Sequence, residues 1–158
     1  MRSRPTSRAL VLICALTLFG AGSALSGQQA QEADSAALEQ AERQARAALE
    51  GFFVAFSRAD NDALQEYCNY PHAFMGAAGS IRVIDDRWEM DFEALRERED
   101  WHSSRLDSAR AFLVKEDKVH YEIVFSRLRA DGTVYRTVPG LWVMTKQDGK
   151  WGLSLRSY

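Results

Sequence analysis

The chain has 158 residues, with 20 Lys and Arg against 22 Asp and Glu, 46% hydrophobic residues and two cysteines. This length fits one domain that can bury a core without disulfide or metal support. The slightly acidic balance argues against a nucleic-acid partner, which requires a basic surface.

The N-terminus has the pattern of a secretory signal peptide. Arg2, Arg4 and Arg8 precede an uncharged, mostly apolar run over 9–25, and small residues follow. We expect cleavage after Ser26, with a cut after Ala24 as the alternative; cleavage exports the protein to the periplasm or the medium and leaves no membrane contact. Cleavage removes three arginines and no acidic residue, so the net charge falls from −2 to about −5. The alternative is a retained membrane anchor, because the run approaches the length of a spanning helix.

Only Cys68 remains after this cleavage, so no internal disulfide is possible. We interpret this lone thiol as a small buried apolar residue. No spacing of Cys and His matches a zinc site. We therefore expect neither a metal nor a cofactor.

Residues 27–33 are a short polar tether in this interpretation, and the domain is expected to occupy 34–158. Asp34 or Ser35 can cap a helix that begins at Ala36 and carries an apolar stripe at helical spacing. The stripe consists of Leu38, Ala41, Ala45, Leu49, Phe52, Phe53 and Phe56. Because its C-terminal end is the heavier part, we expect that end to pack against a sheet.

The remaining pattern predicts two further short helices and six strands. A helix is expected over 63–67, and another follows a cap at Asp91. Strands are expected over 71–75, 80–84, 104–114, 118–129, 133–146 and 150–157, with Asp-Gly pairs at 131–132 and 148–149 forming tight turns. Helices that are grouped, rather than alternating with strands, indicate an α+β fold with a strongly curved, mixed or antiparallel sheet covered by about three helices.

A hollow is expected where the sheet curves away from the helices. Pro139 and Gly140 interrupt the strand over 133–146 and predict a bulge that sharpens the curvature. Tyr121, Ile123 and Phe125 alternate with their neighbours, so they share one face of their strand, which we assign to the concave side. This concave side is the expected site.

Four residue strings, together with the order of elements, connect the chain to a known family. The strings are Tyr70-Pro71-His72, Trp101-His102-Ser103-Ser104, Asp117-Lys118-Val119-His120 and the run over 145–152. Over residues 40–158 the chain resembles the nuclear transport factor 2-like superfamily, particularly its SnoaL-like branch. The resemblance implies a cone-shaped fold. In enzymatic relatives, such as ketosteroid isomerase, scytalone dehydratase and polyketide cyclases, the cone is apolar and a proton is moved on a ring substrate.

Three residues are candidates for such chemistry. His72 and His102 are candidate bases, because imidazole exchanges a proton near neutral pH and both residues stand at the start of strands expected to face the hollow. Tyr121 is the candidate hydrogen-bond donor. The alternative for each is structural, because a buried His or Tyr usually has a protein partner. No carboxylate falls clearly at the position that the resemblance implies for a catalytic acid or base.

The predicted pocket holds a small, largely apolar organic molecule. Its lining is expected to come from Phe56, Phe74, Trp101, Ile123 and Phe125. Arg110 and Arg156 each interrupt an apolar strand, so either can pair with an anionic ligand. A charge-pairing or solvent-facing role is the simpler interpretation of both.

Two classes of function follow. The first is an exported protein that binds a small molecule. In its enzymatic form, the protein is a cofactor-free isomerase, dehydratase or cyclase that uses His72 or His102 as the base. The second is a non-catalytic interaction domain that forms a homodimer through the outer sheet face, where Val124, Leu128, Trp142 and Met144 would supply the patch.

Overall fold

A computed structural model describes residues 21–158 and divides the chain into two units, Met1–Asp34 and Ser35–Tyr158. The expected signal peptide falls mainly on residues 1–20, which lie outside the described residues. Within the described part, no helix has the length and apolar character needed to cross a membrane.

The first helix begins earlier than the sequence predicts. Helix α1 spans Ala21–Ser57, so the expected start at Ala36 is wrong and the expected tether over 27–33 is helical. Residues 27–33 are rich in Ala and Gln and contain no proline, so no proline stops the helix there. The cap predicted at Asp91 is present, because its side chain accepts a hydrogen bond from the backbone N–H of Ala94, and Asp60 caps the helix before it through the N–H of Ala63.

The other elements agree with the predicted ranges to within about three residues. In chain order they are α2 (Asn61–Gln65), β1 (Cys68–Met75), the single turn η1 (Ala77–Gly79), β2 (Ile81–Ile84), α3 (Phe92–Glu99), β3 (Ser103–Lys115), β4 (Lys118–Leu128), β5 (Val134–Gln147) and β6 (Lys150–Ser157).

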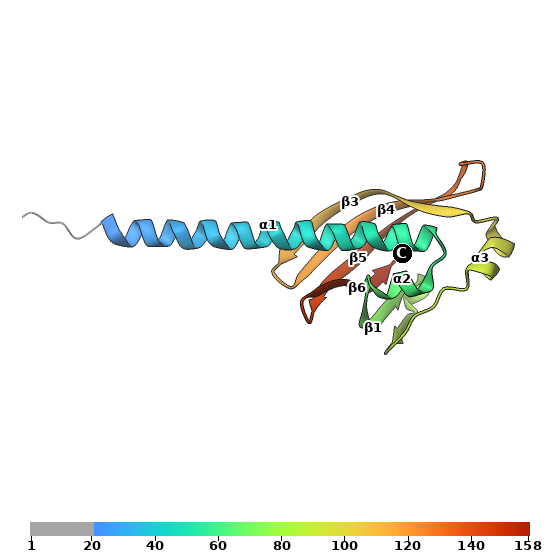
Figure 1. Cartoon of the computed structure of the whole chain (residues 1–158), viewed down its shortest axis with the longest axis horizontal. Coiled ribbons are helices and arrows are strands. Elements are labelled where there is room, and N and C mark those ends of the chain that lie inside the picture. Colours follow the sequence, from blue (N-terminus) through green and yellow to red (C-terminus); the bar gives the residue numbers. More distant parts are fainter. Residues whose placement is uncertain (1–20) are drawn as a thin grey trace, which may run out of the picture. The chain divides into compact units, whose positions relative to one another are not determined.

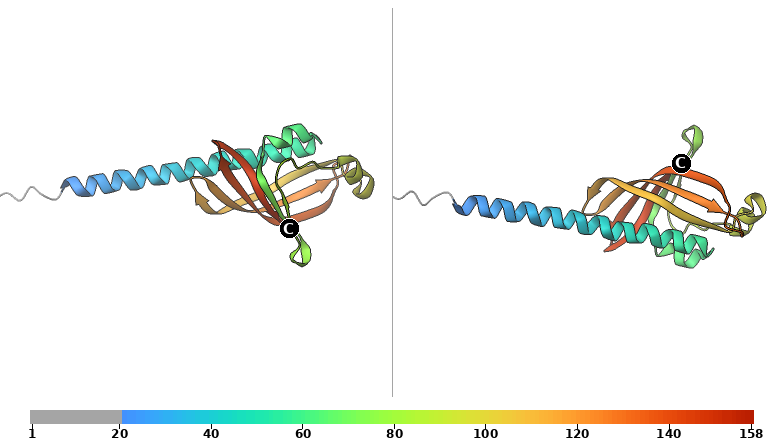
Figure 2. Two further views of the ribbon diagram at one scale, coloured as in Figure 1. Left: turned by 90° about the horizontal axis from the view of Figure 1, so that it is seen from below. Right: turned by 90° about the horizontal axis from the view of Figure 1, so that it is seen from above.

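The strands form one mixed sheet in the order β2-β1-β6-β5-β4-β3. All neighbouring pairs are antiparallel except β1 and β6, which are parallel. The predicted α+β class is therefore confirmed. Figure 2 shows that the β1–β2 hairpin, in light green, projects from the rest of the sheet, and its edge strand exposes Ile81 and Val83.

The core lies between α1 and the inner face of the sheet (Figure 1). The second half of α1 buries the predicted stripe from Ala41 onward, with Leu49 fully buried, whereas Leu38 at the start of the stripe is exposed. Further along the helix, the ring of Phe52 meets that of Trp142 edge-on at 5.3 Å, and the ring of Phe53 stacks on Trp142 at 5.2 Å. This aromatic burial is the main source of contact between helix and sheet.

Residues of β4 alternate as the sequence predicts. Tyr121 and Ile123 are fully buried and Phe125 is nearly so, while Glu122 between them is exposed. Glu122 pairs with Arg110 on the other side of the sheet. The assignment of Tyr121, Ile123 and Phe125 to the inner face is confirmed.

The bulge expected at Pro139 and Gly140 is wrong. Both residues pair with β4 in unbroken register, opposite Val124 and Ile123. Pairing between β5 and β6 begins only at Leu141, so at Pro139 the strand has a neighbour on one side and the missing N–H removes no bond to β6. The strand irregularities lie instead at Tyr135 of β5, between Cys68 and Ala73 of β1, within β3 and at the Ser154 region of β6.

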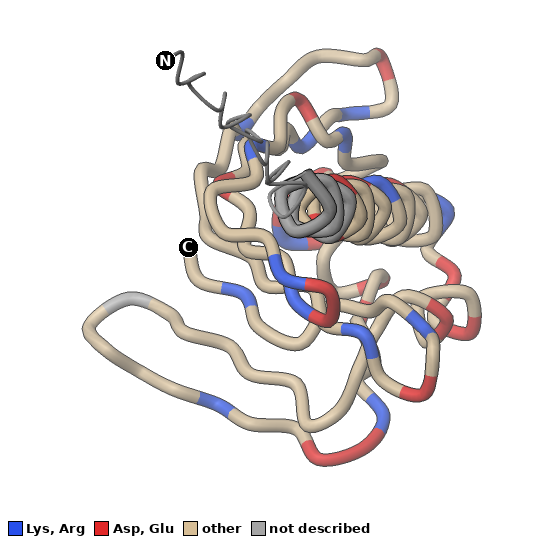
Figure 3. Tube along the Cα trace, turned by 90° about the vertical axis from the view of Figure 1, so that its left-hand side faces the viewer, with Lys and Arg blue, Asp and Glu red and all other residues tan. Residues whose placement is uncertain are grey.

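Charged residues are interspersed along the chain (Figure 3). Several are paired, and Arg127 donates to Glu99 at 2.5 Å in the least exposed of these pairs. Arg156 departs from this pattern of paired charges.

Candidate functional site

A small cavity lies between α1 and the inner face of the sheet. Its volume is about 20 Å³, and the lining residues are Phe52, Phe53, Phe56, Ser104, Phe125, Arg127, Trp142, Arg156 and Tyr158. A volume of this size holds about one water molecule. The wide hollow that the sequence predicts is therefore mostly filled, because rings from α1 occupy the space that the sheet's curvature creates.

An irregularity in β6 turns Arg156 toward this cavity. Val143 pairs with Leu155 and Met144 pairs with Leu153, so Ser154 is an extra residue in β6. Such an insertion reverses the alternation of the strand. Arg156 therefore lies on the same face as Leu153, and it is only 3% exposed.

Aromatic rings surround the buried guanidinium group of Arg156. Its carbon atom Cζ lies 4.0 Å from the ring centre of Phe74 and 4.1 Å from that of Trp88, with Phe52 and Trp142 farther away at 5.5 and 5.7 Å. Cation–π attraction in a desolvated position stabilises this arrangement by up to about 2 kcal/mol for a ring in good geometry. The rings also fix the orientation of the guanidinium plane.

The hydrogen bonds of Arg156 are incomplete. Its Nε–H donates to Nε2 of His72 at 3.1 Å, while Nη2 has no partner among the described residues. No Asp or Glu in that part of the chain forms an ion pair with it. Burial lowers the pKa of Arg156 to about 10, so the group is still a cation at neutral pH. A buried cation without a compensating anion is costly.

His72 lies on β1 beside this cation and is fully buried. Burial, and next the positive charge of Arg156, lower the pKa of His72 to about 3. The imidazole is therefore neutral at physiological pH and serves as the acceptor for Arg156. A group with so low a pKa is a weak general base at neutral pH.

Two further donors at the cavity lack partners. Nε1 of Trp142 and Nε of Arg127 are buried and, within the described residues, make no hydrogen bond. Both side chains line the cavity together with Arg156. Three of the residues that line the cavity thus carry buried N–H donors that lack an acceptor among the described residues, and no Asp or Glu lines it, so it is suited to a group with acceptor atoms.

The other two candidate catalytic residues lie elsewhere. His102 is exposed, so the expectation that it faces the hollow is wrong; it precedes the first residue of β3, and its backbone N–H donates to the carbonyl of Leu128 at 2.9 Å. Tyr121 is buried, and its hydroxyl donates to the carbonyl of Glu42 at 3.1 Å. The structure does not bring His72, His102 and Tyr121 to one cavity.

The predicted pocket residues divide into two groups. Phe56 and Phe125 line the cavity, and Phe74 contacts Arg156. Trp101 and Ile123 are buried in the core outside the cavity lining, with the indole of Trp101 donating to the hydroxyl of Ser104 at 2.9 Å. Sequence reasoning named Arg156 as a partner for an anionic ligand but missed the cavity-lining roles of Phe52, Phe53, Ser104, Arg127 and Tyr158.

Within residues 21–158, no group of three or more His, Cys, Asp and Glu side chains is arranged to hold a metal ion. Cys68 is buried, and burial raises the pKa of its thiol to about 11, so the sulfur is a neutral core atom at physiological pH. The predicted apolar role of this thiol fits that environment.

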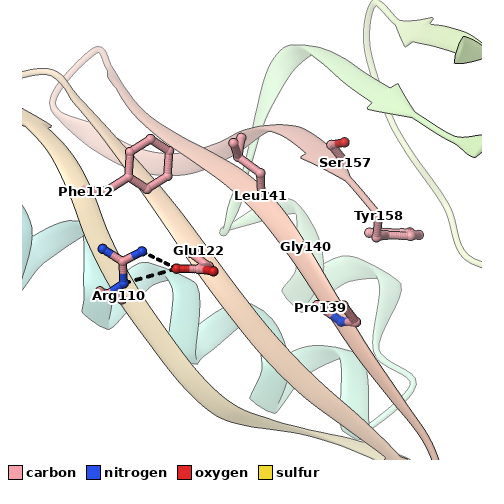
Figure 4. Close-up of a pocket in the computed structure, with 8 residues that line it drawn as sticks. All are labelled: Arg110, Phe112, Glu122, Pro139, Gly140, Leu141, Ser157 and Tyr158. Atoms are coloured by element: carbon pink, nitrogen blue, oxygen red, sulfur yellow. Dashed lines mark hydrogen bonds and ion pairs between the residues drawn. The ribbon is translucent and has the colours of Figure 1, made fainter.

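A second concavity of about 540 Å³ lies on the outer face of the sheet (Figure 4). Phe112 and Leu141 are 48% and 38% exposed beside it, and Arg110 pairs with Glu122. Trp142 and Met144, which the sequence assigns to an outer patch, are instead buried on the inner face. The predicted outer position of these two side chains of β5 is therefore wrong.

The six-stranded curved sheet with its long helix across the inner face defines an α+β fold of the nuclear transport factor 2-like, cystatin-like class. The predicted resemblance is therefore confirmed at the level of the fold. No family model matches the sequence, and no curated protein matches it either.

Solved structures share this fold at low sequence identity. A protein of unknown function with a cystatin-like fold from Nostoc punctiforme is 15% identical and superposes with a TM-score of 0.59 over 73% of this chain and 87% of its own. An NTF2-like protein from Novosphingobium aromaticivorans is 14% identical, with a TM-score of 0.54 over 88% and 89%. A protein from Catenulispora acidiphila in complex with S-DNPA is 16% identical, with a TM-score of 0.55 over 77% and 91%.

Proposed function

We propose that the protein is exported and binds a small organic molecule at the cavity beside Arg156. One observation carries this proposal: Arg156 is 3% exposed, and its Nη2 has no partner in the part of the chain that the structure describes. An uncompensated buried cation destabilises a fold by several kcal/mol, so its presence is best explained by a ligand that uses it. The complex of the Catenulispora protein with S-DNPA supports a ligand-binding use of this fold.

The cavity has to widen for a molecule larger than water. A groove of about 390 Å³ between α1 and β3 shares two of its lining residues, Phe53 and Ser104, with the cavity. A movement of the Phe53 ring joins the two spaces. The combined volume then reaches the range of about 300–1,000 Å³ that is usual for ligand sites.

The geometry favours binding over proton-transfer chemistry. His72 is held as a neutral acceptor, His102 is exposed, and Tyr121 already donates to a backbone carbonyl. An isomerase, dehydratase or cyclase that used either histidine as base would lose turnover when that histidine is replaced by Ala. We expect instead that the wild-type protein binds its ligand without forming any product.

A fragment screen by NMR tests the binding function. We expect ligands to shift the backbone amides of residues that line the cavity and the adjoining groove, such as Phe53, Ser104 and Arg156. The amides of Phe112 and Leu141 on the outer face provide the internal control and should not move. A screen in which no fragment binds, or in which every shift clusters on the outer face, would remove the proposal.

A homodimer through the outer face is the second candidate. The exposure of Phe112 and Leu141 at 48% and 38% favours it, because neighbouring apolar side chains on a sheet face are suited to pairing with a second copy. This role can coexist with ligand binding, since the two faces of the sheet are separate.

A further inference from the structure

On the basis of the binding function proposed above, we propose that the ligand is an aromatic monocarboxylic acid, and that Arg156 and Trp142 recognise its carboxylate. The unpaired donors, the charge and the aromatic rings around the cavity all fit this class of ligand.

The donors around the cavity match a carboxylate. Nη2 of Arg156, Nε1 of Trp142 and Nε of Arg127 are all buried N–H groups that lack an acceptor within the described residues. All three side chains line one cavity of about 20 Å³. A water molecule accepts about two hydrogen bonds, whereas a carboxylate has two oxygens with about four acceptor sites. A ligand carboxylate can therefore satisfy donors that a single water leaves partly unpaired.

The side chains that line the cavity have one uncompensated positive charge, which favours a ligand with one negative charge. Arg127 is already neutralised by Glu99, whose carboxylate oxygen lies 2.5 Å from its Nη1. Arg156 has no such partner among the residues that the structure describes. A monoanion therefore balances the site, and a guanidinium–carboxylate bond is stronger than a bond between neutral groups.

The guanidinium group is held ready for this contact. Phe74 and Trp88 lie about 4 Å from its carbon atom, and His72 accepts from its Nε–H. These contacts hold the plane of the guanidinium group, while Nη2 is left without an acceptor among the described residues. A donor fixed in advance loses little conformational freedom when the ligand binds.

The rest of the cavity is suited to an aromatic body. Phe52, Phe53, Phe56 and Phe125 line it, and the Phe53 ring stacks on Trp142 at 5.2 Å with an interplanar angle of 13°. A planar ligand ring can take the place of Phe53 in this stack when Phe53 moves toward the groove. The carboxylate then reaches Arg156 while the ring remains between aromatic side chains.

Benzoate and benzamide form a matched pair of probes for the test, because they have nearly the same shape but only benzoate is charged. We expect benzoate to bind the wild-type protein about tenfold or more tightly than benzamide, as measured by titration calorimetry. In nitrogen-15 NMR spectra, benzoate should shift the indole N–H signal of Trp142, assigned with Trp142→Phe. Arg156→Met should remove the preference for benzoate, and Arg110→Met on the outer face should leave it intact.

The possible failures are distinguishable. Equal affinity for benzoate and benzamide in the wild-type protein would overturn the carboxylate inference while the binding function stands. If neither probe binds and the fragment screen is also negative, both proposals fail. If Arg156→Met does not fold, the wild-type preference and the Trp142 signal decide, and a benzoate effect confined to other sites would count against the inference.

Discussion

Acid should destabilise this fold through His72. The pKa of His72 is lowered from 6.5 to about 3 in the folded protein, first by burial and then by the charge of Arg156. Between these two values the unfolded chain binds a proton that the folded protein does not. Stability should therefore be full above pH 6.5 and should fall as the pH drops toward 3.

The size of the effect follows from the two pKa values. Each pH unit between them changes the free energy of unfolding by up to about 1.4 kcal/mol for one site. From pH 7 to pH 4 the loss due to His72 alone should be about 3 kcal/mol. Such a loss is a large part of the total stability of a domain of this size.

Denaturant unfolding of the wild-type protein and of His72→Gln at several pH values measures this contribution. A Gln oxygen can accept from Arg156 but does not titrate, so the wild-type protein should lose about 3 kcal/mol more than the variant between pH 7 and pH 4. The exposed His102, replaced by Gln, is the matched control and should follow the wild-type curve. A difference between wild type and His72→Gln that stays constant with pH would refute the reasoning.

Three further changes test other parts of the molecule. If the outer face forms a homodimer, Phe112→Asp should convert it to a monomer in light scattering while leaving the unfolding temperature nearly unchanged; a wild-type monomer would contradict the dimer. Tyr121→Phe removes the bond to the carbonyl of Glu42 and should cost about 0.5–1.5 kcal/mol in denaturant unfolding, and no change would mean that this bond contributes nothing. Gly152→Ala should destabilise by about 1–3 kcal/mol, because a Cβ there would lie 2.5 Å from Oδ1 of Asn69; an unaltered midpoint would show that Asn69 moves freely.

Local patterns were sufficient for most of the fold. The alternation around Tyr121 and Ile123 gives the inner face of β4, and the Asp148-Gly149 pair gives the turn into β6, where both residues have positive φ. The apolar stripe of α1 that ends at Phe56 likewise follows from the local spacing of its residues. These features depend on neighbouring residues, so the printed sequence contains the information needed to predict them.

The site could not be predicted because its geometry depends on bulges. In β3, irregularities near Asp107 and Phe112 reverse the alternation, so Phe112 is exposed although it shares parity with the partly buried Leu106. In β6, the extra residue Ser154 turns Arg156 inward. Which residue of a strand is left unpaired depends on its partner strands, and no local pattern at Ser154 or Asp107 specifies it. The one available signal was a charged residue in an apolar strand.

The parallel pairing of β1 with β6 has a consequence for how the chain reaches its folded state. The β1–β2 hairpin is made long before β6, yet β6 is the strand that joins it to β5. Ribosomal synthesis must therefore reach residue 157 before the hairpin can be incorporated, and contacts between such distant segments form slowly. Until then, the nascent polypeptide has an incomplete interior, and its hairpin lacks the neighbouring strand on which it packs in the finished sheet.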